Sequence, residues 1–457
     1  MPDIIIVILA VIFVLGIAIN IHEFGHFAVA KLLGMRVDAY SFFGLGPRIW
    51  GFKYGHTDYR ISAIPLGAYV KLYGDESNSG LEGEDDKSEP VPESELYELR
   101  PRWQKFLVMI GGPFMNIMLA LAIPFFGAWF MGLPSAPAPI VGVVKAGGAA
   151  EQAGVKVGDR IVQFDGIENP TWERVRNDSL IAPERAIPIV VERQGQKLPL
   201  TIKPTKVEKD GNVIGMLDLD PDVGVEPVVA SVVEADKPAS QGGLQPGDRA
   251  ISINGEPVRN SNEIINQIRS NKDAPLRLLV ERNGERKELN IQAKQGDDGV
   301  FRIGAGFVPD EKSMKREPAS IGRAASFAVN SNLEIIRLTG KVFGQLFAGE
   351  RSVKDAGVAG PIGIVQIISK VVTEQGFVGL ISILALISLN LGVFNLLPIP
   401  MLDGGQIALL GIEGFLGLFG LTLSMGIKEK IQLVGLAIIL VLMVTTILFD
   451  VSRLFSK

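Results

Sequence analysis

The 457-residue chain contains no cysteine and only three histidines, and it has no excess of basic residues. Without cysteine it has no thiol nucleophile, no disulfide framework and no thiolate zinc site, and its redox compartment stays undetermined. A formal net charge of −5 argues against nucleic acid as a partner, because binding to phosphates needs a basic surface. Because histidine is so rare, the four-residue spacing of His22 and His26 is informative.

Composition places the chain between a membrane bundle and a soluble enzyme. Hydrophobic residues make up 47% of it and its mean hydropathy is +0.28, yet 21% of its residues are charged. A purely polytopic bundle carries fewer charges, and a soluble enzyme does not reach this hydropathy. We therefore expect membrane-spanning helices near both ends with soluble domains between them, since 457 residues are too many for one core.

Four apolar segments are long enough to cross a hydrocarbon core of about 30 Å. We predict transmembrane helices at residues 1–31, 104–132, 376–405 and 431–452. A signal peptide is the alternative for the first segment, but the start of the chain lacks a basic region and no small-residue cleavage site follows. The sequence thus predicts a polytopic α-helical membrane protein with about four transmembrane helices.

Lysine and arginine beside the spans predict the orientation of the chain. Lys31 and Arg36 follow the first span, and Arg100, Arg102 and Lys105 lead into the second. By the positive-inside rule, the loop between these spans is cytoplasmic, and both termini and the long central region lie on the opposite side of the membrane.

The predicted cytoplasmic loop, residues 32–103, has two parts. Residues 57–73 are rich in β-forming residues around Pro65, Leu66 and Gly67, which predicts a hairpin whose apolar side enters the membrane. Residues 74–101 are acidic and punctuated by glycine, serine and proline, which predicts a flexible linker.

An internal repeat occupies the central region. Residues 150–166 recur at 239–255 in the pattern A-x-x-(A/G)-G-(V/L)-x-x-G-D-R, followed by a strand and (D/N)-G. Glycine permits positive φ at the turns, and Asp-Gly or Asn-Gly ends each strand. This pattern resembles the PDZ fold of bacterial proteases, so we expect two inserted α+β PDZ domains at 136–220 and 221–308. Amphipathic bridging helices are expected at 313–370.

The segment His22-Glu23-Phe24-Gly25-His26 lies inside the first predicted span. Residues four apart share one helix face, so both imidazoles can reach one metal ion at about 2.0–2.1 Å, with Glu23 beside them to accept a proton from water. A pair of helix histidines without metal is the alternative. Ionisable groups at membrane depth cost several kcal/mol, however, and these three need a compensating partner, for which zinc is suited.

A catalytic zinc needs a third protein ligand, and Asp38, His56 and Asp403 are the candidates. Asp403 follows two prolines and precedes two glycines, so it lies on irregular backbone at membrane depth. Such backbone is tolerated only inside protein or beside a wet cavity, which favours Asp403. A helix N-cap is the alternative role for this residue.

Together these motifs resemble the bacterial site-2 protease family. The resemblance rests on His-Glu-Phe-Gly-His at 22–26, on Asn-x-x-Pro-x-Pro-x-x-Asp-Gly-Gly at 395–405, and on the tandem repeat between the second and third spans. It covers the chain from residue 4 to residue 455, and the two motifs together are highly specific.

The resemblance implies an intramembrane zinc metalloendopeptidase with one Zn²⁺ per chain. By that likeness His22, His26 and Asp403 are the zinc ligands, and Glu23 is the general base.

The resemblance also implies how a substrate is held. Asn390 and Asn395 would bind the backbone of an unwound substrate helix, and the hairpin around Gly67 and Tyr69 would present a strand edge to it. Hydrogen bonds between helices are the alternative role for the two asparagines.

The family's activity further implies partners and a location. The substrate is expected to be a single-span membrane protein, such as an anti-sigma factor already shortened by another protease, whose cleavage releases a cytoplasmic signalling fragment in a stress response. The chain itself is expected in the bacterial inner membrane, in contact with lipid, with both termini and the PDZ domains periplasmic. The repeats are expected to gate access to the site.

Two other functions remain open at this stage. A membrane-anchored PDZ scaffold with an inactive zinc motif would explain the repeats but not the ionisable residues within the spans. A zinc transporter would be expected to show inverted repeats and many intramembrane polar sites, and neither occurs here. Zinc-dependent cleavage of a transmembrane substrate would separate the protease from both.

Overall fold

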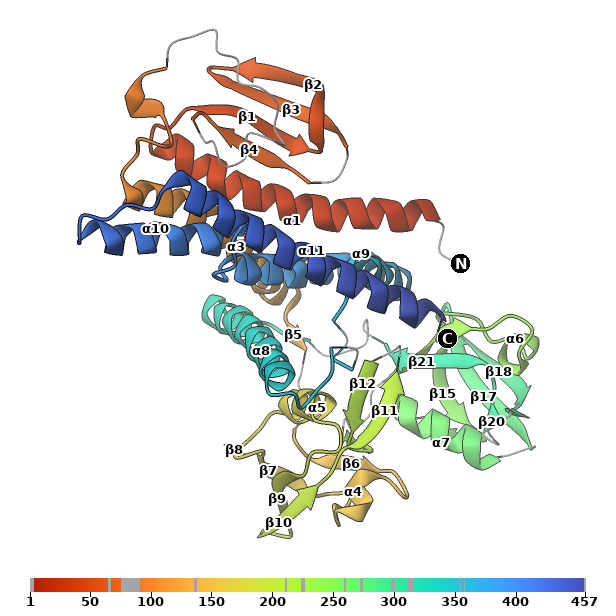
Figure 1. The fold of residues 1–457 in the computed structure, drawn as a ribbon. Coiled ribbons are helices and arrows are strands. Elements are labelled where there is room, and N and C mark those ends of the chain that lie inside the picture. The colour runs from red at the N-terminus through yellow and green to blue at the C-terminus, as the bar shows by residue number, and fades with distance from the viewer. Residues whose placement is uncertain are drawn as a thin grey trace. The chain divides into compact units, whose positions relative to one another are not determined.

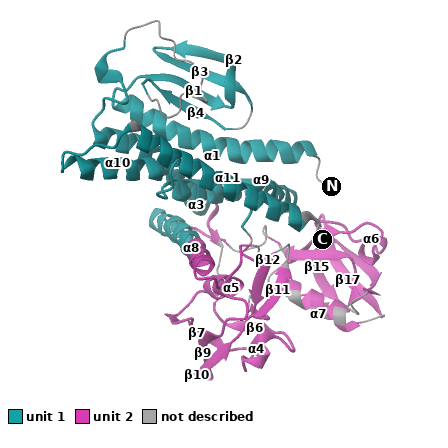
Figure 2. Ribbon diagram, in the orientation of Figure 1, with its two compact units in different colours: residues 1–130, 319–337, 358–457 teal, residues 131–318, 338–357 magenta. Residues whose placement is uncertain are grey.

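The computed structural model describes residues 4–64, 67–74, 91–134, 138–209, 212–222, 227–258, 260–271, 274–296, 301–310, 316–353, 355–356 and 358–455. The chain forms two compact units, which Figure 2 distinguishes by colour. The first comprises Met1–Phe130, Ala319–Arg337 and Val358–Lys457, and the second comprises Met131–Pro318 and Leu338–Gly357.

In the described part of the first unit, four helices are long and apolar enough to cross a membrane (Figure 1): α1 (Ile4–Leu32), α3 (Arg102–Met131), α9 (Pro361–Asn395) and α11 (Met425–Phe455). Long apolar segments form helices in a bilayer because lipid offers the backbone no hydrogen-bond partners. Buried residues of α1, such as Val14 and Ala18, share a core cluster with Ile383 and Leu384 of α9. The chain is therefore a multi-pass helical membrane protein.

The third spanning helix differs from its predicted bounds of 376–405. Helix α9 begins at Pro361, which suits a first helical position, and bends at Gly376, whose φ of +62° is not helical. It ends at Asn395, before the two prolines, and a separate helix, α10 (Asp403–Gly417), starts at the predicted metal ligand.

The segment between α1 and α3 forms a four-stranded sheet with the order β2-β3-β1-β4. Its strands are β1 (Val37–Phe43), β2 (Leu45–Tyr54), β3 (Thr57–Ile64) and β4 (Tyr69–Leu72). The predicted hairpin over 57–73 is wrong: β3 pairs in parallel with β1, and β4 pairs antiparallel with the other side of β1. The hairpin turn lies at Gly55 and His56, between β2 and β3, while Pro65 and Leu66 lie outside the described residues.

The predicted flexible linker over 74–101 is ordered in its last part, while residues 75–90 lie outside the described residues. A short 3-10 helix, η1 (Glu93–Glu95), is followed by Tyr97, which is buried in a core cluster with Met35 and Val108. The Arg36 amide also donates to the Glu95 carbonyl at 3.0 Å. An aromatic side chain thus anchors a segment whose acidic composition predicted flexibility.

The second unit contains two α+β modules with separate hydrophobic cores. The first module has helices α4 (Ala149–Gln152) and α5 (Trp172–Leu180) and strands β6 (Val141–Val144), β7 (Arg160–Phe164), β8 (Ile167–Glu168), β9 (Ile187–Arg193), β10 (Gln196–Ile202), β11 (Thr205–Lys209), β12 (Asn212–Met216) and β13 (Leu219–Pro221). The second has helices α6 (Pro238–Gln241) and α7 (Ser261–Asn271) and strands β14 (Val228–Val233), β15 (Arg249–Ile253), β16 (Glu256–Pro257), β17 (Pro275–Arg282), β18 (Glu285–Gln292), β19 (Lys294–Gln295), β20 (Phe301–Arg302) and β21 (Ala305–Pro309). Strands β5 (Leu133–Pro134) and β22 (Arg316–Glu317) pair with each other.

The two modules repeat one buried ion pair at the Gly-Asp-Arg motif. Asp159 accepts from Arg193 Nε at 2.7 Å, and Asp248 accepts from Arg282 Nε at 2.6 Å. Burial alone would raise the pKa of each aspartate, but the hydrogen bonds from arginine outweigh burial and hold each pKa below its ordinary value. The motif's aspartate therefore ties a turn to the strand that follows the module's longer helix.

Helix α8 (Ile321–Phe347) lies where bridging helices were predicted. In the first unit, the buried Asn332 amide donates to the Ala120 carbonyl of α3 at 3.1 Å. In the second unit, Lys341 lies 3.4 Å from Asp165 and 3.5 Å from Asp178. Polar contacts thus fix each half of α8 to its own unit.

Candidate metal centre

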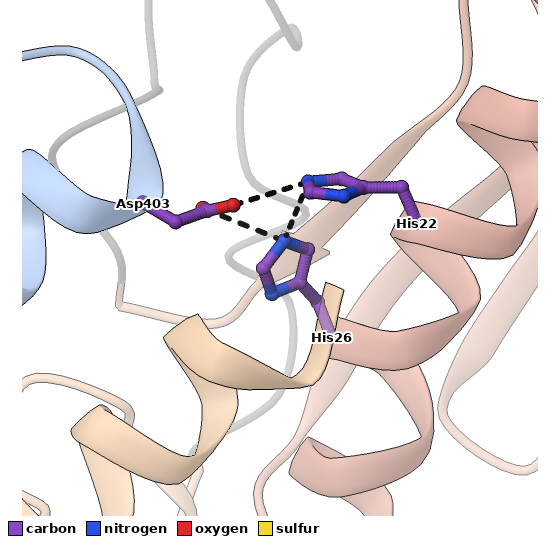
Figure 3. A group of neighbouring side chains, drawn as sticks. All are labelled: His22, His26 and Asp403. Atoms are coloured by element: carbon purple, nitrogen blue, oxygen red, sulfur yellow. Dashed lines mark hydrogen bonds and ion pairs between the residues drawn. The ribbon is translucent and has the colours of Figure 1, made fainter. Parts of the chain in front are cut away.

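His22 and His26 stand one turn apart on α1 and point toward Asp403 at the start of α10 (Figure 3). The two Nε2 atoms are 3.2 Å apart. Asp403 Oδ2 lies 3.1 Å from His22 Nε2, and Asp403 Oδ1 lies 3.5 Å from His26 Nε2. Among the described residues, these three offer ligand atoms that all lie within 4.8 Å of one another.

Their spacing fits a tetrahedral zinc ion. Ligand atoms at about 2.0–2.1 Å from such an ion lie about 3.3 Å from each other. The two Nε2 atoms are 3.2 Å apart, and a different carboxylate oxygen of Asp403 lies near each of them, at 3.1 and 3.5 Å, so all three separations are close to this value. Two imidazoles and one carboxylate also leave one coordination position open, as catalytic zinc sites do. His22, His26 and Asp403 would therefore hold the ion.

Glycines let α3 come very close to the two histidines. A Cβ atom on Gly25 would lie 2.1 Å from the Gly111 carbonyl oxygen. A Cβ atom on Gly112 would lie 2.4 Å from His26 Nε2 and 2.8 Å from His22 Cε1. Helices α1 and α3 thus meet backbone to backbone at the site, as membrane helices do where small residues face each other.

Helix α3 also contacts the outer nitrogen of each imidazole. His26 Nδ1 lies 2.7 Å from the Val108 carbonyl oxygen, which can only accept, so this nitrogen carries the ring proton. His22 Nδ1 lies 3.2 Å from the side-chain nitrogen Nδ2 of Asn116, which is fully buried. Both Nε2 atoms are consequently turned toward Asp403.

Asp403 is presented by strained and tightly packed backbone. Met401 has a φ of +80°, a conformation that costs a non-glycine residue about 1–3 kcal/mol and is often kept at functional sites. Cβ atoms on Gly404 and Gly405 would lie 2.3 Å and 2.2 Å from the carbonyl oxygens of Leu396 and Ile399. The two glycines therefore let α10 start directly against the end of α9.

A cavity of about 230 Å³ lies beside the ligand group, and Glu23 lines it. The Glu23 carboxylate accepts a hydrogen bond from the Val70 amide of β4. Among the described strands β4 pairs with β1 alone and is an edge of its sheet, and Val70 and Leu72 of this edge strand line the cavity. The remaining lining residues come from several elements: Leu72, Val108, Met109, Asn395, Met401, Leu402 and Gln406.

The predicted substrate-binding residues lie at different distances from the cavity. Asn395 lines it, and its amide nitrogen is 3.2 Å from His22 Nε2. Asn390, Gly67 and Tyr69 are not among the lining residues. Tyr69 is buried, and its ring is stacked under the Arg60 guanidinium at 5.2 Å.

The other candidates for the third ligand lie away from the ligand group. Asp38 is 3.8 Å from Lys71 within the sheet, and His56 is exposed at the turn between β2 and β3. Sequence reasoning missed Val70, Met401 and Gln406. The alternation of side chains along β4 is the one sequence signal that points to Val70. Met401 and Gln406 carry no such signal, because an apolar and a polar residue of ordinary type do not stand out in a sequence.

Known proteins resemble this chain over most of its length. The family model described as "Peptidase family M50" matches residues 10–442. The chain is 32% identical over 467 residues to the "Regulator of sigma-E protease RseP" of Salmonella typhimurium, covering 97% of this chain and 98% of that protein. It is 31% identical to the protein of that name from Escherichia coli, covering 96% and 97%, and 30% identical to a "Putative zinc metalloprotease" of Vibrio cholerae, covering 99% and 100%.

Among solved structures, the PDZ domain of an SdrC-like protein from Listeria monocytogenes is 25% identical. The match covers 19% of the present chain and 92% of the Listeria domain, with a TM-score of 0.18.

Proposed function

The chain belongs to peptidase family M50 and is a zinc metalloprotease of the site-2 type, and from this premise we propose that it hydrolyses a peptide bond in or near the transmembrane segment of single-span membrane proteins. The observation that carries the proposal is the ligand triangle of His22, His26 and Asp403, with Nε2 and carboxylate oxygens at tetrahedral spacing beside Glu23. A peptide-binding scaffold has no use for this arrangement.

The proposed reaction needs polarisation of the scissile carbonyl and transfer of a proton, and different groups at the cavity supply each. When bound, one zinc ion per chain supplies a Lewis acid that polarises the scissile carbonyl. Glu23 accepts a proton from the attacking water and returns it to the leaving amine nitrogen, for which a carboxylate on the rigid helix α1 is well placed. The cavity is somewhat smaller than ordinary ligand pockets of about 300–1,000 Å³, so it suits a narrow, extended segment of chain.

The free edge of β4 supports binding of an extended substrate. A transmembrane helix hides its amides in internal hydrogen bonds, and these must be replaced when it unwinds. A strand edge replaces them by adding the substrate as a further strand. Val70 and Leu72 on that edge, together with Asn395 at the end of α9, lie next to the ligand group. Gly67 and Tyr69, just before and at the start of β4, are proposed to act in the same region, as is Asn390, more than one turn before Asn395 on α9.

The names of the relatives support a more specific substrate. We infer that it is an anti-sigma factor, already shortened by another protease, whose cleavage releases a cytoplasmic signalling fragment. The basic residues around the first two spans support an inner-membrane protein whose termini and central modules are periplasmic. The two central modules are proposed to be PDZ domains that gate access to the site.

The proposal is tested with purified protein and a model single-span substrate, incubated with and without a zinc chelator and analysed by mass spectrometry. A cut within or next to the substrate's transmembrane segment, lost with chelator and restored by added zinc, is the expected result. An uncut substrate in the zinc-loaded protein, with the chain inserted and folded, would favour the scaffold instead.

A further inference from the structure

We propose that Asn116 and Ser388 form a buried positioning pair that fixes the ring proton of His22 on Nδ1, so that Nε2 is free for zinc. The inference rests on the zinc site of the proposed function and adds two residues to it. They come from α3 and α9, and neither helix contains one of the three proposed ligands. Asn116 belongs to α3 and Ser388 to α9, and both are completely buried.

The contacts form a chain that ends on a metal ligand. Ser388 Oγ lies 2.9 Å from the Asn116 backbone oxygen and 3.3 Å from the Asn116 side-chain oxygen Oδ1. The Asn116 amide nitrogen Nδ2 lies 3.2 Å from His22 Nδ1. His22 Nε2, on the far side of the ring, faces Asp403 and His26.

The chemistry of the metal decides which way the amide points. Zinc binds the lone pair of Nε2, so the ring proton must be on Nδ1, and Nδ1 then needs an acceptor. The oxygen and nitrogen of an asparagine side chain exchange places by a half-turn, and the hydrogen-bond network selects between them. The structure has Nδ2 toward His22, and a ring that binds metal through Nε2 is satisfied only after the half-turn that brings Oδ1 to this position.

Ser388 stabilises that orientation. Its hydroxyl has one proton, and the Asn116 backbone carbonyl at 2.9 Å accepts it. The serine oxygen is then left as an acceptor, and it matches the amide NH₂ group of Asn116, not the amide oxygen. In this arrangement His22 Nδ1, the Asn116 side-chain oxygen and the Ser388 hydroxyl each have a hydrogen-bond partner, which matters because an unpaired polar group in a buried site is costly.

The arrangement is the counterpart of the contact at His26. There, Nδ1 donates to the Val108 carbonyl of the same helix α3, and the backbone needs no further support. At His22 the Asn116 side chain contacts the outer ring nitrogen, so this contact can be removed by substitution. Outer partners of metal-binding histidines commonly change metal affinity by about 10–100-fold.

The experiment measures zinc affinity by competition with a chromophoric chelator, using the full-length protein in detergent. Asn116→Leu removes the hydrogen bond at similar volume, and Asn116→Asp keeps an oxygen toward Nδ1. Asn332→Leu is the matched control, because Asn332 is another buried asparagine that contacts α3, at the Ala120 carbonyl away from the ligands. We expect Asn116→Leu to weaken zinc binding by about 10–100-fold, while Asn116→Asp and Asn332→Leu stay within about threefold of wild type.

Ser388→Ala gives a second test that does not depend on the leucine variant folding. It should weaken zinc binding severalfold in the wild-type background and have no further effect in Asn116→Asp, whose two carboxylate oxygens need no orientation. Because the chain has only three histidines, ¹⁵N-histidine spectra of the zinc-loaded protein should also show a protonated Nδ1 on His22.

Unchanged zinc affinity in Asn116→Leu, or an equal loss in Asn116→Asp and Asn116→Leu, would overturn the inference, because the oxygen acceptor would then be irrelevant. An additive effect of Ser388→Ala in the Asn116→Asp background would do the same. These outcomes leave the proposed function standing, whereas wild-type protein that binds no zinc at all would refute both.

Discussion

Alanine at Gly112 should disable the metal centre, although the change adds only one methyl group. Its Cβ atom would lie 2.4 Å from His26 Nε2 and 2.8 Å from His22 Cε1, whereas ordinary contacts begin near 3.4 Å. Either the rings or α3 must therefore move by about 1 Å, and a shift of that size at a catalytic group can cost about 100-fold in rate. Both rings are held from behind by α3, so they cannot retreat without losing the contacts to Val108 and Asn116.

Gly127→Ala is the matched control for this prediction. Gly127 lies on the same helix, and a Cβ atom there would have no neighbour within 4 Å. Zinc content by elemental analysis and cleavage of a single-span substrate are measured in both variants after membrane insertion is verified. We expect cleavage to fall about 100-fold in Gly112→Ala and to stay unchanged in Gly127→Ala. Equal zinc content and equal cleavage in the two variants would refute the close approach of α3 to the ligands.

Three further predictions concern the rest of the chain. A reporter fused at residue 200 should be extracytoplasmic and one inserted near residue 85 cytoplasmic, and the reverse result would place the central modules in the cytoplasm. Replacing residues 136–308 with a flexible linker should leave zinc content intact and permit cleavage of substrates that have not been shortened. If the inserted, zinc-bound deletion protein still refuses them, the modules recruit substrate and do not gate it. The first module should lose stability in acid as Asp159 is protonated, because the lowered pKa of this aspartate gives a stabilisation that is fully present above the unfolded value of about 3.9 and is lost as the pH falls from there through the folded value. With Trp172 kept as the sole tryptophan, its fluorescence should report a melting temperature that falls less between pH 6 and pH 3 in Asp159→Asn than in its parent.

The grouping of His22, His26 and Asp403 could be predicted from sequence because the chemistry of these residues is conspicuous. His22 and His26 are paired by helix geometry alone, and Asp403 is marked by prolines and glycines that interrupt an apolar segment. The spans were equally accessible, since length and apolarity decide them. These features depend on residues close together in the chain.

Features that depend on contacts between distant segments were missed. Asn116 and Gly112 look like ordinary residues of a membrane helix until α3 is placed against α1. The pairing of β4 was also mispredicted. Local β-propensity over 57–73 shows that strands exist there, but it does not show that β1 lies between β3 and β4. Tyr97 likewise anchors a segment whose average composition predicted flexibility.

The most direct test of the central claim is Glu23→Gln, which keeps the size of the side chain and removes the base. Because Glu23 is not one of the three proposed ligands, the purified variant should contain as much zinc as wild type, about one ion per chain, while His22→Ala should lose it. Cleavage of a single-span substrate, followed by mass spectrometry, should be abolished in Glu23→Gln despite the bound metal. Cleavage by this variant within about tenfold of wild type would contradict the account, because the proton transfers would then belong to another group.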